Sequence, residues 1–115
     1  MTVKIFHNPR CSKSRQTLEL LKENGIAPLI IEYLKTPPSK KELQTVLNLL
    51  NLQPRDLMRK NEAEYKENNL DNNALTADQL IDAMITHPKL IERPIVLNGS
   101  QARIGRPPES VLEIL

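Results

Sequence analysis

The sequence has no tryptophan, one phenylalanine and two tyrosines, so aromatic residues make up only 3% of its 115 positions. Proteins that bind single-stranded nucleic acid stack the bases on aromatic side chains, which this chain largely lacks. Its 16 basic and 14 acidic residues leave a net charge of +2 and are interleaved, so the chain has no basic block suited to a phosphate backbone. We therefore expect no nucleic-acid partner.

Long apolar runs and targeting patterns are also missing. The chain contains neither a run of about 20 apolar residues nor a recognisable signal peptide. Hydrophobic residues make up 39% and charged residues 26%, as in ordinary globular proteins. We therefore expect a cytoplasmic protein with no membrane partner. The length suits one domain spanning residues 1–115. The sequence has no long apolar stripe that would form an interface with a second copy, so we expect a monomer.

Cysteine is nearly absent as well, since Cys11 is the single cysteine of the chain. One cysteine cannot form an internal disulfide, and in a reducing compartment it remains a free thiol. Any redox chemistry at Cys11 therefore requires a second thiol from outside the chain. One cysteine and two distant histidines do not give a zinc-binding spacing, and no calcium loop is present, so we expect no metal.

The N-terminal third has a strand, helix, strand pattern. The run from Val3 to Phe6 is apolar and ends at an Asn-Pro turn, which is typical of a strand. A helix is expected from Ser12 to the stop signal Asn24-Gly25. The run LIIEY, from Leu29 to Tyr33, predicts a second strand that is parallel to the first and buried on both faces.

The middle of the chain is predicted to be helical. Two capping boxes, in which a Ser or Thr N-cap is followed three residues later by Glu or Gln, mark helix starts. They are Ser39 with Glu42, for a helix through about Leu50, and Thr76 with Gln79, for a helix that ends at His87-Pro88. Shorter helical segments are expected over RDLMRK after Pro54 and over residues 61–69.

The C-terminal part returns to strand patterns. Strands are expected at 95–97 and 102–104, joined by the hairpin signal Asn98-Gly99, and a last helix over SVLEIL follows Pro107-Pro108-Glu109. The whole order of elements indicates an α/β, thioredoxin-like fold, with a four-stranded mixed sheet and flanking helices.

Cys11 falls between a strand end and a helix start, where unpaired backbone N–H groups and the helix dipole favour an anion. Arg10 and Lys13 flank it, His7 ends the preceding strand, and Ser14 is placed to donate a hydrogen bond to a thiolate. These features lower the pKa of a thiol and favour a reactive Cys11 over a buried, inert one, although both remain open on this evidence. His7 is equally compatible with a helper base and with a structural histidine.

Three arginines have informative neighbours: Arg59 in LMRKNEAEY, Arg93 before Pro94, and Arg106 before Pro107. Taken singly, each fits an ordinary surface residue. However, Arg93 and Arg106 lie at strand ends that a sheet of this kind would bring to the edge bearing Cys11. Guanidinium groups match tetrahedral oxyanions such as phosphate, sulfate or arsenate.

Four segments together resemble the glutaredoxin-coupled bacterial arsenate reductase family. They are HNPRCSKSRQTL, LMRKNEAEY, LIERPIV and RPPESVLEIL, and they span almost the entire chain in the same order. The resemblance implies a thioredoxin-like fold with a helical insertion. It also implies the following site: Cys11 as the nucleophile, His7 and Ser14 tuning the thiol, Arg59, Arg93 and Arg106 binding the oxyanion, and a cis bond before Pro94.

The chemistry implied by the resemblance is attack of the Cys11 thiolate on arsenate, followed by release of arsenite. Glutathione is then a co-substrate and glutaredoxin a protein partner, with no bound cofactor. Two alternatives stay open. One is a glutathione-dependent thiol-disulfide oxidoreductase without arsenate activity, whose arginines would bind glutathione carboxylates. The other, less favoured because such proteins usually carry a CxxC pair, is a redox regulator that binds RNA polymerase.

Overall fold

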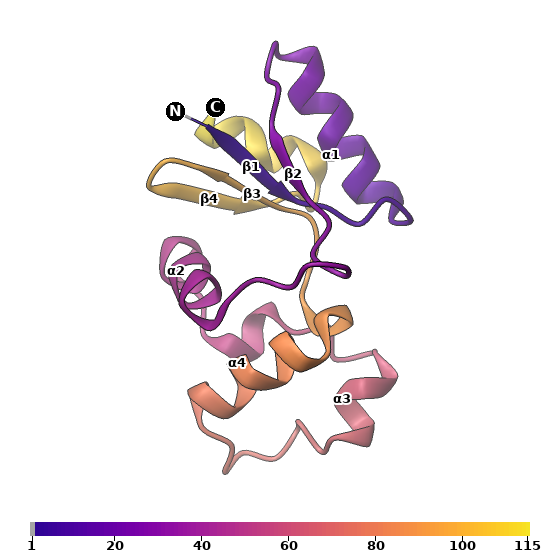
Figure 1. Ribbon diagram of the computed structural model, residues 1–115, viewed down its shortest axis with the longest axis vertical. Helices are drawn as coiled ribbons and strands as arrows, with labels where there is room; N and C mark the ends of the chain where they lie inside the picture. Colours follow the sequence, from indigo (N-terminus) through magenta and orange to yellow (C-terminus); the bar gives the residue numbers. More distant parts are fainter. Residues whose placement is uncertain (1) are drawn as a thin grey trace. The chain divides into compact units, whose positions relative to one another are not determined.

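The computed structural model describes residues 2–115, with strands near both ends of the chain and a run of helices between them (Figure 1). The elements are β1 Val3–Phe6, α1 Ser12–Glu23, β2 Leu29–Ile31, α2 Lys40–Leu50, η1 Pro54–Leu57, α3 Ala63–Glu67, α4 Ala77–Thr86, η2 Pro88–Leu90, β3 Ile95–Asn98, β4 Gln101–Ile104 and η3 Pro108–Ile114, where η denotes a 3₁₀ helix. They form two compact units. The first joins the chain up to Thr36 with Arg93–Leu115, and the second is Pro37–Glu92.

The first unit contains a four-stranded mixed sheet with the strand order β2-β1-β3-β4. The two central strands, β1 and β3, are antiparallel, and Ile5 lies opposite Val96. β1 is parallel to β2 on its other side, and β3 is antiparallel to β4. The predicted fold class is confirmed, including the parallel β1-α1-β2 unit and the C-terminal hairpin.

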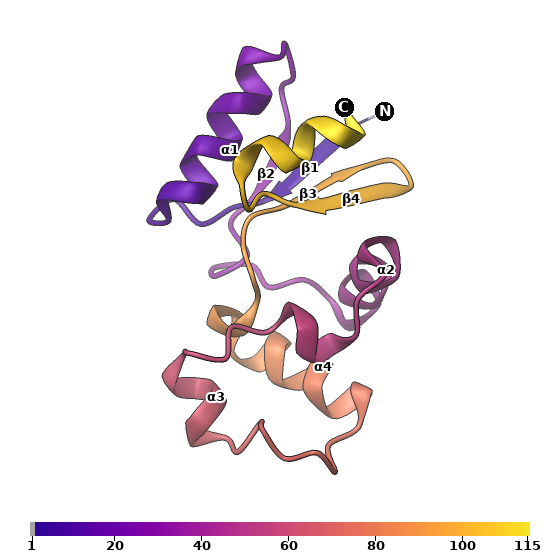
Figure 2. The ribbon, with the colours of Figure 1, turned by 180° about the vertical axis from the view of Figure 1, so that it is seen from behind.

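One face of this sheet is covered by α1 and η3, which Figure 2 shows side by side. Ile5 of β1 and Val96 of β3 point to this face and are fully buried there against Leu21 of α1 and Val111 and Ile114 of η3. Burial of these aliphatic side chains is the main favourable contribution to the stability of the first unit. It also fixes the start of α1 relative to the ends of the central strands.

The prediction that the second strand is buried on both faces is wrong. β2 ends at Ile31, and Leu29 and Ile30 are 50% and 44% exposed. β2 is an edge strand, and the buried cluster beneath α1 and η3 draws its strand residues from β1 and β3. An apolar run indicates a strand, but it does not distinguish an edge strand from a central one.

The helix starts predicted in the second unit are confirmed. The Ser39 hydroxyl accepts from the Glu42 N–H at 3.1 Å, and the Glu42 carboxylate accepts from the Ser39 N–H at 3.1 Å. Thr76 and Gln79 make the same reciprocal pair at the start of α4. Each box satisfies N–H groups that the first turn of a helix otherwise leaves without partners.

The two shorter helical segments were predicted too long. The segment after Pro54 ends at Leu57, because Met58 is extended and forms a β-bridge with Ile91. The next helix covers only Ala63–Glu67 instead of residues 61–69. In the C-terminal hairpin, Gly99 supplies the positive φ of 61° that the tight turn needs, and β4 starts at Gln101, one residue earlier than predicted. None of the helices in residues 2–115 is long and apolar enough to cross a membrane.

Three segments meet at Gly105, directly after β4. The Gly105 N–H donates to the Pro94 carbonyl at 2.9 Å. A Cβ atom at position 105 would lie 2.5 Å from Thr17 Oγ1 and 2.8 Å from Pro94 Cγ, so no larger residue fits without displacement. Gly105 therefore allows the segments that carry Arg93 and Arg106 to lie against α1.

We expect Gly105→Ala to lower the free energy of unfolding by about 1–3 kcal/mol, because the added methyl group overpacks a fully enclosed site. Urea denaturation followed by circular dichroism measures this change. Thr17→Ala removes both Thr17 atoms that approach the new methyl group, so the double variant should lose less stability than the sum of the single changes. Strictly additive losses would contradict the proposed steric cause.

Candidate active site

Cys11 is the N-cap of α1. Its backbone is extended, with φ −95° and ψ 123°, and its carbonyl accepts the first helical hydrogen bond, from the Arg15 N–H at 3.0 Å. In this position the backbone N–H groups of Ser14 and Lys13 face the Cys11 sulfur and stabilise its thiolate, although the side chain accepts no full cap hydrogen bond. A Ser or Asp at an N-cap usually accepts a hydrogen bond from these N–H groups. Here a sulfur atom faces them without making that bond.

The surroundings of Cys11 lower the pKa of its thiol below the usual value. Partial burial alone would raise this pKa, but the Ser14 N–H and the Arg93 guanidinium stabilise the thiolate more strongly. Arg106 Nη2 lies 3.6 Å from the sulfur and adds a second guanidinium. The thiolate is therefore favoured more than in a cysteine without these neighbours, and the prediction of a reactive environment agrees with this geometry.

The β3-β4 hairpin explains why two arginines from distant positions reach one sulfur. Ile95 is paired with Ile104, so Arg93, two residues before, and Arg106, two residues after, leave the same end of the hairpin. Arg106 Nε also donates to the Arg93 carbonyl at 2.8 Å, which ties the two segments together. The peptide bond between Arg93 and Pro94 is cis, as the resemblance implies. A second cis bond, between Arg106 and Pro107, was not predicted.

Arg59 belongs to the second unit. Its N–H donates to the Leu90 carbonyl at 2.7 Å, and its guanidinium forms an ion pair with Glu62 at 2.7 Å. The side chain is 25% exposed, so part of its surface is accessible. Its role as a third oxyanion ligand stays a prediction.

His7 and Ser14 form a buried pair beneath the turn that carries Cys11. Ser14 Oγ lies 2.7 Å from His7 Nδ1 and accepts from the Asn8 N–H at 3.0 Å. The expected donation from the Ser14 hydroxyl to the thiolate is not what the structure has: the backbone N–H of Ser14 faces the sulfur instead. The hydroxyl joins the end of β1 to the first turn of α1.

Burial lowers the pKa of His7 below its usual value, partly opposed by Glu32. Arg15 and Lys22 lower this pKa further because they repel an imidazolium. His7 is consequently a neutral ring at pH 7, which suits a positioning role through Ser14 better than a role as a cationic partner of the thiolate.

Two positions that shape this site were not predicted from the sequence. Asn8 Oδ1 accepts from the Arg10 N–H at 3.0 Å, which closes the turn between β1 and Cys11. An Asx turn at Asn-Pro was the available signal, since Asn side chains commonly bond to the backbone two residues further on. Gly105 was also missed, because close packing against α1 leaves no mark in the local sequence.

The groups around Cys11 combine a nucleophile with an anion-binding site. The thiolate, two guanidiniums and the amino end of a helix all favour a negatively charged ligand. A tetrahedral oxyanion that contacts both arginines would place its central atom next to the sulfur. Within residues 2–115, no group of three or more His, Cys, Asp or Glu side chains is arranged to hold a metal ion.

The chain is similar in sequence and in fold to several known proteins. A sequence model described as the ArsC family matches residues 6–114. The chain is 55% identical to "Uncharacterized protein YfgD" of Escherichia coli K12, over 98% of this chain and 96% of that protein. It is 52% identical to "Arsenate reductase" of Haemophilus influenzae over the full length of both. The solved structure of "Arsenate reductase from Vibrio cholerae" has 57% identity and a TM-score of 0.97, over 100% of this chain and 98% of that one.

We expect Ser14→Ala to lower the free energy of unfolding by about 1–3 kcal/mol, because His7 Nδ1 and the Asn8 N–H each lose a buried partner. Thermal or urea denaturation measures the loss. Ser12→Ala is the matched control: Ser12 is exposed in the same helical turn, and its replacement should change stability by less than about 0.5 kcal/mol. Equal effects of the two substitutions would count against the His7-Ser14 pair as a structural bond.

We expect Arg93→Gln to raise the pKa of the Cys11 thiol, because the substitution removes a positive charge that stabilises the thiolate. The rate of alkylation by iodoacetamide, followed as a function of pH, reports this pKa. Arg103→Gln removes an equal charge from a side chain that pairs with Glu113, and should leave the alkylation profile unchanged. A wild-type midpoint in Arg93→Gln would show that Arg93 does not act on the thiol.

Proposed function

This chain belongs to the ArsC family, and from that premise we propose that it is an arsenate reductase that uses Cys11 as its nucleophile. The observation that carries the proposal is the position of the Cys11 sulfur, at the N-cap of α1 and 3.6 Å from Arg106 Nη2. The relatives from Haemophilus influenzae and Vibrio cholerae bear the name arsenate reductase, and the chain matches both over nearly their full lengths.

Arsenate binding is assigned to Arg93 and Arg106, with Arg59 of the second unit as a third ligand. Planar guanidinium groups donate two parallel hydrogen bonds to an oxyanion, which fixes its orientation as well as its charge. Arg106 already contacts the Cys11 sulfur, so an oxygen atom bound by Arg106 brings the arsenic within reach of the thiolate. Holding both reactants in place lowers the entropic part of the barrier.

In the first step the Cys11 thiolate attacks arsenic(V). A sulfur–arsenic bond forms and one arsenic–oxygen bond breaks, so that an arsenate hydroxyl leaves as hydroxide and takes up a proton from the solvent to become water. The arginines stabilise the negative charge on the remaining oxygens while this exchange takes place. Arsenic remains in the +5 state, because no electrons have yet been transferred from sulfur.

In the second step a glutathione thiolate attacks the sulfur of Cys11. A disulfide forms between Cys11 and glutathione, the sulfur–arsenic bond breaks, and its electron pair leaves with arsenic, which is released as arsenite. Two thiols are oxidised to one disulfide while arsenic(V) gains two electrons. Glutathione is therefore a co-substrate, and the chain needs no bound cofactor for the transfer of electrons.

In the last step a thiolate of glutaredoxin attacks the glutathione sulfur of the mixed disulfide and releases Cys11 as a thiolate. Cys11 is the single cysteine of the chain, so the resolving thiol must come from another molecule. His7 and Ser14 act as positioning residues in this scheme, and Pro94 places Arg93. We assign the reaction to a monomer in the cytoplasm, where a reducing environment keeps Cys11 free.

We expect the wild-type protein to release arsenite from arsenate when glutathione and glutaredoxin are present, and Cys11→Ser to release none, because a hydroxyl group neither forms the arsenic adduct nor a disulfide. Chromatographic separation of arsenite from arsenate measures the product. Ser12→Ala, next to Cys11 but exposed, is the matched control and should retain activity.

A wild-type protein that reduces glutathione mixed disulfides but releases no arsenite would contradict arsenate as the substrate. That outcome would support the thiol-disulfide oxidoreductase, in which Arg93 and Arg106 bind carboxylates of glutathione. Arsenite release that survives Cys11→Ser would contradict Cys11 as the nucleophile.

A further inference from the structure

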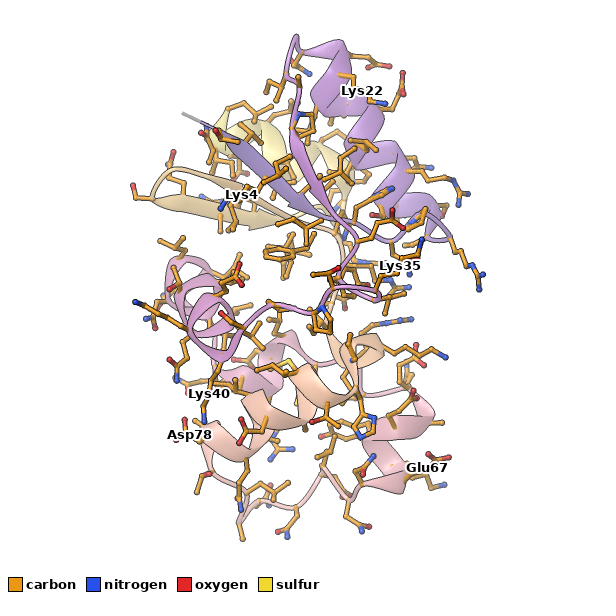
Figure 3. All side chains as sticks on the ribbon, in the orientation of Figure 1. Lys4, Lys22, Lys35, Lys40, Glu67 and Asp78 are labelled. Carbon is orange, nitrogen blue, oxygen red and sulfur yellow. The ribbon has the colours of Figure 1, made fainter. Side chains whose placement is uncertain are left out.

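A cavity of about 230 Å³ opens in the first unit between the β1-α1 turn and the segment after β2. Its lining residues are His7, Asn8, Pro9 and Arg10 on one side and Glu32, Leu34 and Lys35 on the other. Lys35 is labelled in Figure 3 on the segment that follows β2. This cavity contains none of the three arginines assigned to arsenate, so the reaction as described leaves it without a role.

The rim of this cavity carries two cations and one carboxylate. The Arg10 guanidinium is exposed and makes no hydrogen bond or ion pair with any residue in 2–115. Lys35 Nζ lies 3.5 Å from Glu32 Oε1, in an ion pair whose side chains are 78% and 42% exposed. An ion pair this exposed contributes little to stability, so both partners are available to a ligand.

We propose that this cavity binds the γ-glutamyl end of glutathione, an inference that rests on the proposed function. That end carries an α-carboxylate and an α-ammonium on the same carbon. Arg10 and Lys35 provide the cations for the carboxylate, and Glu32 provides the carboxylate for the ammonium. A ligand with both charges is therefore matched at every charged group of the rim.

The size and position of the cavity agree with one end of a tripeptide. Pockets that enclose a whole drug-sized ligand measure about 300–1,000 Å³, so a smaller cavity accommodates part of a ligand. Arg10 directly precedes Cys11, and adjacent Cα atoms are about 3.8 Å apart. Cysteine is the central unit of glutathione, so a γ-glutamyl group in the cavity leaves the thiol one unit away, and Cys11 is the residue that follows the lining residue Arg10.

Other ligands of the same reaction fit the cavity less well. Arsenate carries only negative charge, and Glu32 would repel it. The glycyl end of glutathione has a carboxylate without an ammonium group, so Glu32 would be left facing a like charge. Arg106 and Arg93 instead lie beside the Cys11 sulfur, where arsenate must bind for the thiolate to reach its arsenic atom.

The test uses the intact protein and a reaction that needs no arsenate. The Cys11 thiolate attacks glutathione disulfide, forms a mixed disulfide and releases one glutathione thiolate, and mass spectrometry follows the added mass. 2-Hydroxyethyl disulfide, which has no charged end, reports the reactivity of the thiol alone. The ratio of the two rates therefore measures recognition of glutathione apart from any change in the pKa of Cys11.

We expect the double variant Arg10→Gln and Lys35→Gln to lower this rate ratio about tenfold, the effect of losing a charge-assisted contact at a partly exposed site. The double variant Lys4→Gln and Lys41→Gln removes the same charge from residues outside the cavity and should keep the wild-type ratio. In the wild type, the disulfide of γ-glutamylcysteine should react faster than 2-hydroxyethyl disulfide by the same factor as glutathione disulfide does. The disulfide of cysteinylglycine, which has no γ-glutamyl group, should lose this advantage in rate.

An unchanged ratio in the Arg10 and Lys35 variant, or an advantage that follows cysteinylglycine, would overturn the assignment of the cavity. Failure of the proposed arsenate reductase function would give a different result from failure of the glutathione site. A protein that discriminates between the disulfides as expected but releases no arsenite would retain the glutathione site and lose arsenate as its substrate.

Discussion

The placement of the Cys11 sulfur at the amino end of α1 is the constraint on which the rest of the site depends. Helix N–H groups and the Arg93 guanidinium together outweigh the effect of burial, so that the pKa of the thiol falls. This requires the chain to turn sharply between β1 and α1. The buried Ser14 hydroxyl stabilises the turn through its bonds to His7 and to the Asn8 N–H, and the Asn8 side chain accepts from the Arg10 N–H. A thiol elsewhere on the helix would gain neither the N–H groups nor the guanidiniums.

The two arginines near Cys11 depend on a separate set of contacts. The β3-β4 register brings Arg93 and Arg106 to one end of the hairpin, and the absence of a side chain at Gly105 lets that end approach Thr17 of α1. Stability and function are linked here, because the same close packing that encloses Gly105 carries both guanidiniums toward the sulfur. The buried aliphatic cluster under α1 and η3 supports this arrangement over the rest of the sheet face.

The presence of only one cysteine in the chain limits the redox reaction that the protein can carry out by itself. The chain supplies one of the two thiols that a two-electron reduction consumes, so it must recognise an external thiol as well as an oxyanion. The first unit offers separate surroundings for these two tasks. Two arginines lie beside the Cys11 sulfur, whereas the cavity beyond Arg10 is lined by Arg10, Lys35 and the carboxylate of Glu32. In the proposed scheme the anionic substrate and the zwitterionic end of the thiol therefore bind at different places.

The sequence by itself determined the local elements of this protein. Capping residues at Ser39 and Thr76, the hairpin glycine and the Asn-Pro turn before Cys11 act within a few residues, so their effects can be predicted without knowledge of the fold. Only the tertiary structure decided that β2 is an exposed edge strand, that Gly105 is enclosed, and that the backbone of Ser14 instead of its hydroxyl faces the sulfur. These features arise from contacts between segments far apart in the chain, which local periodicity does not encode.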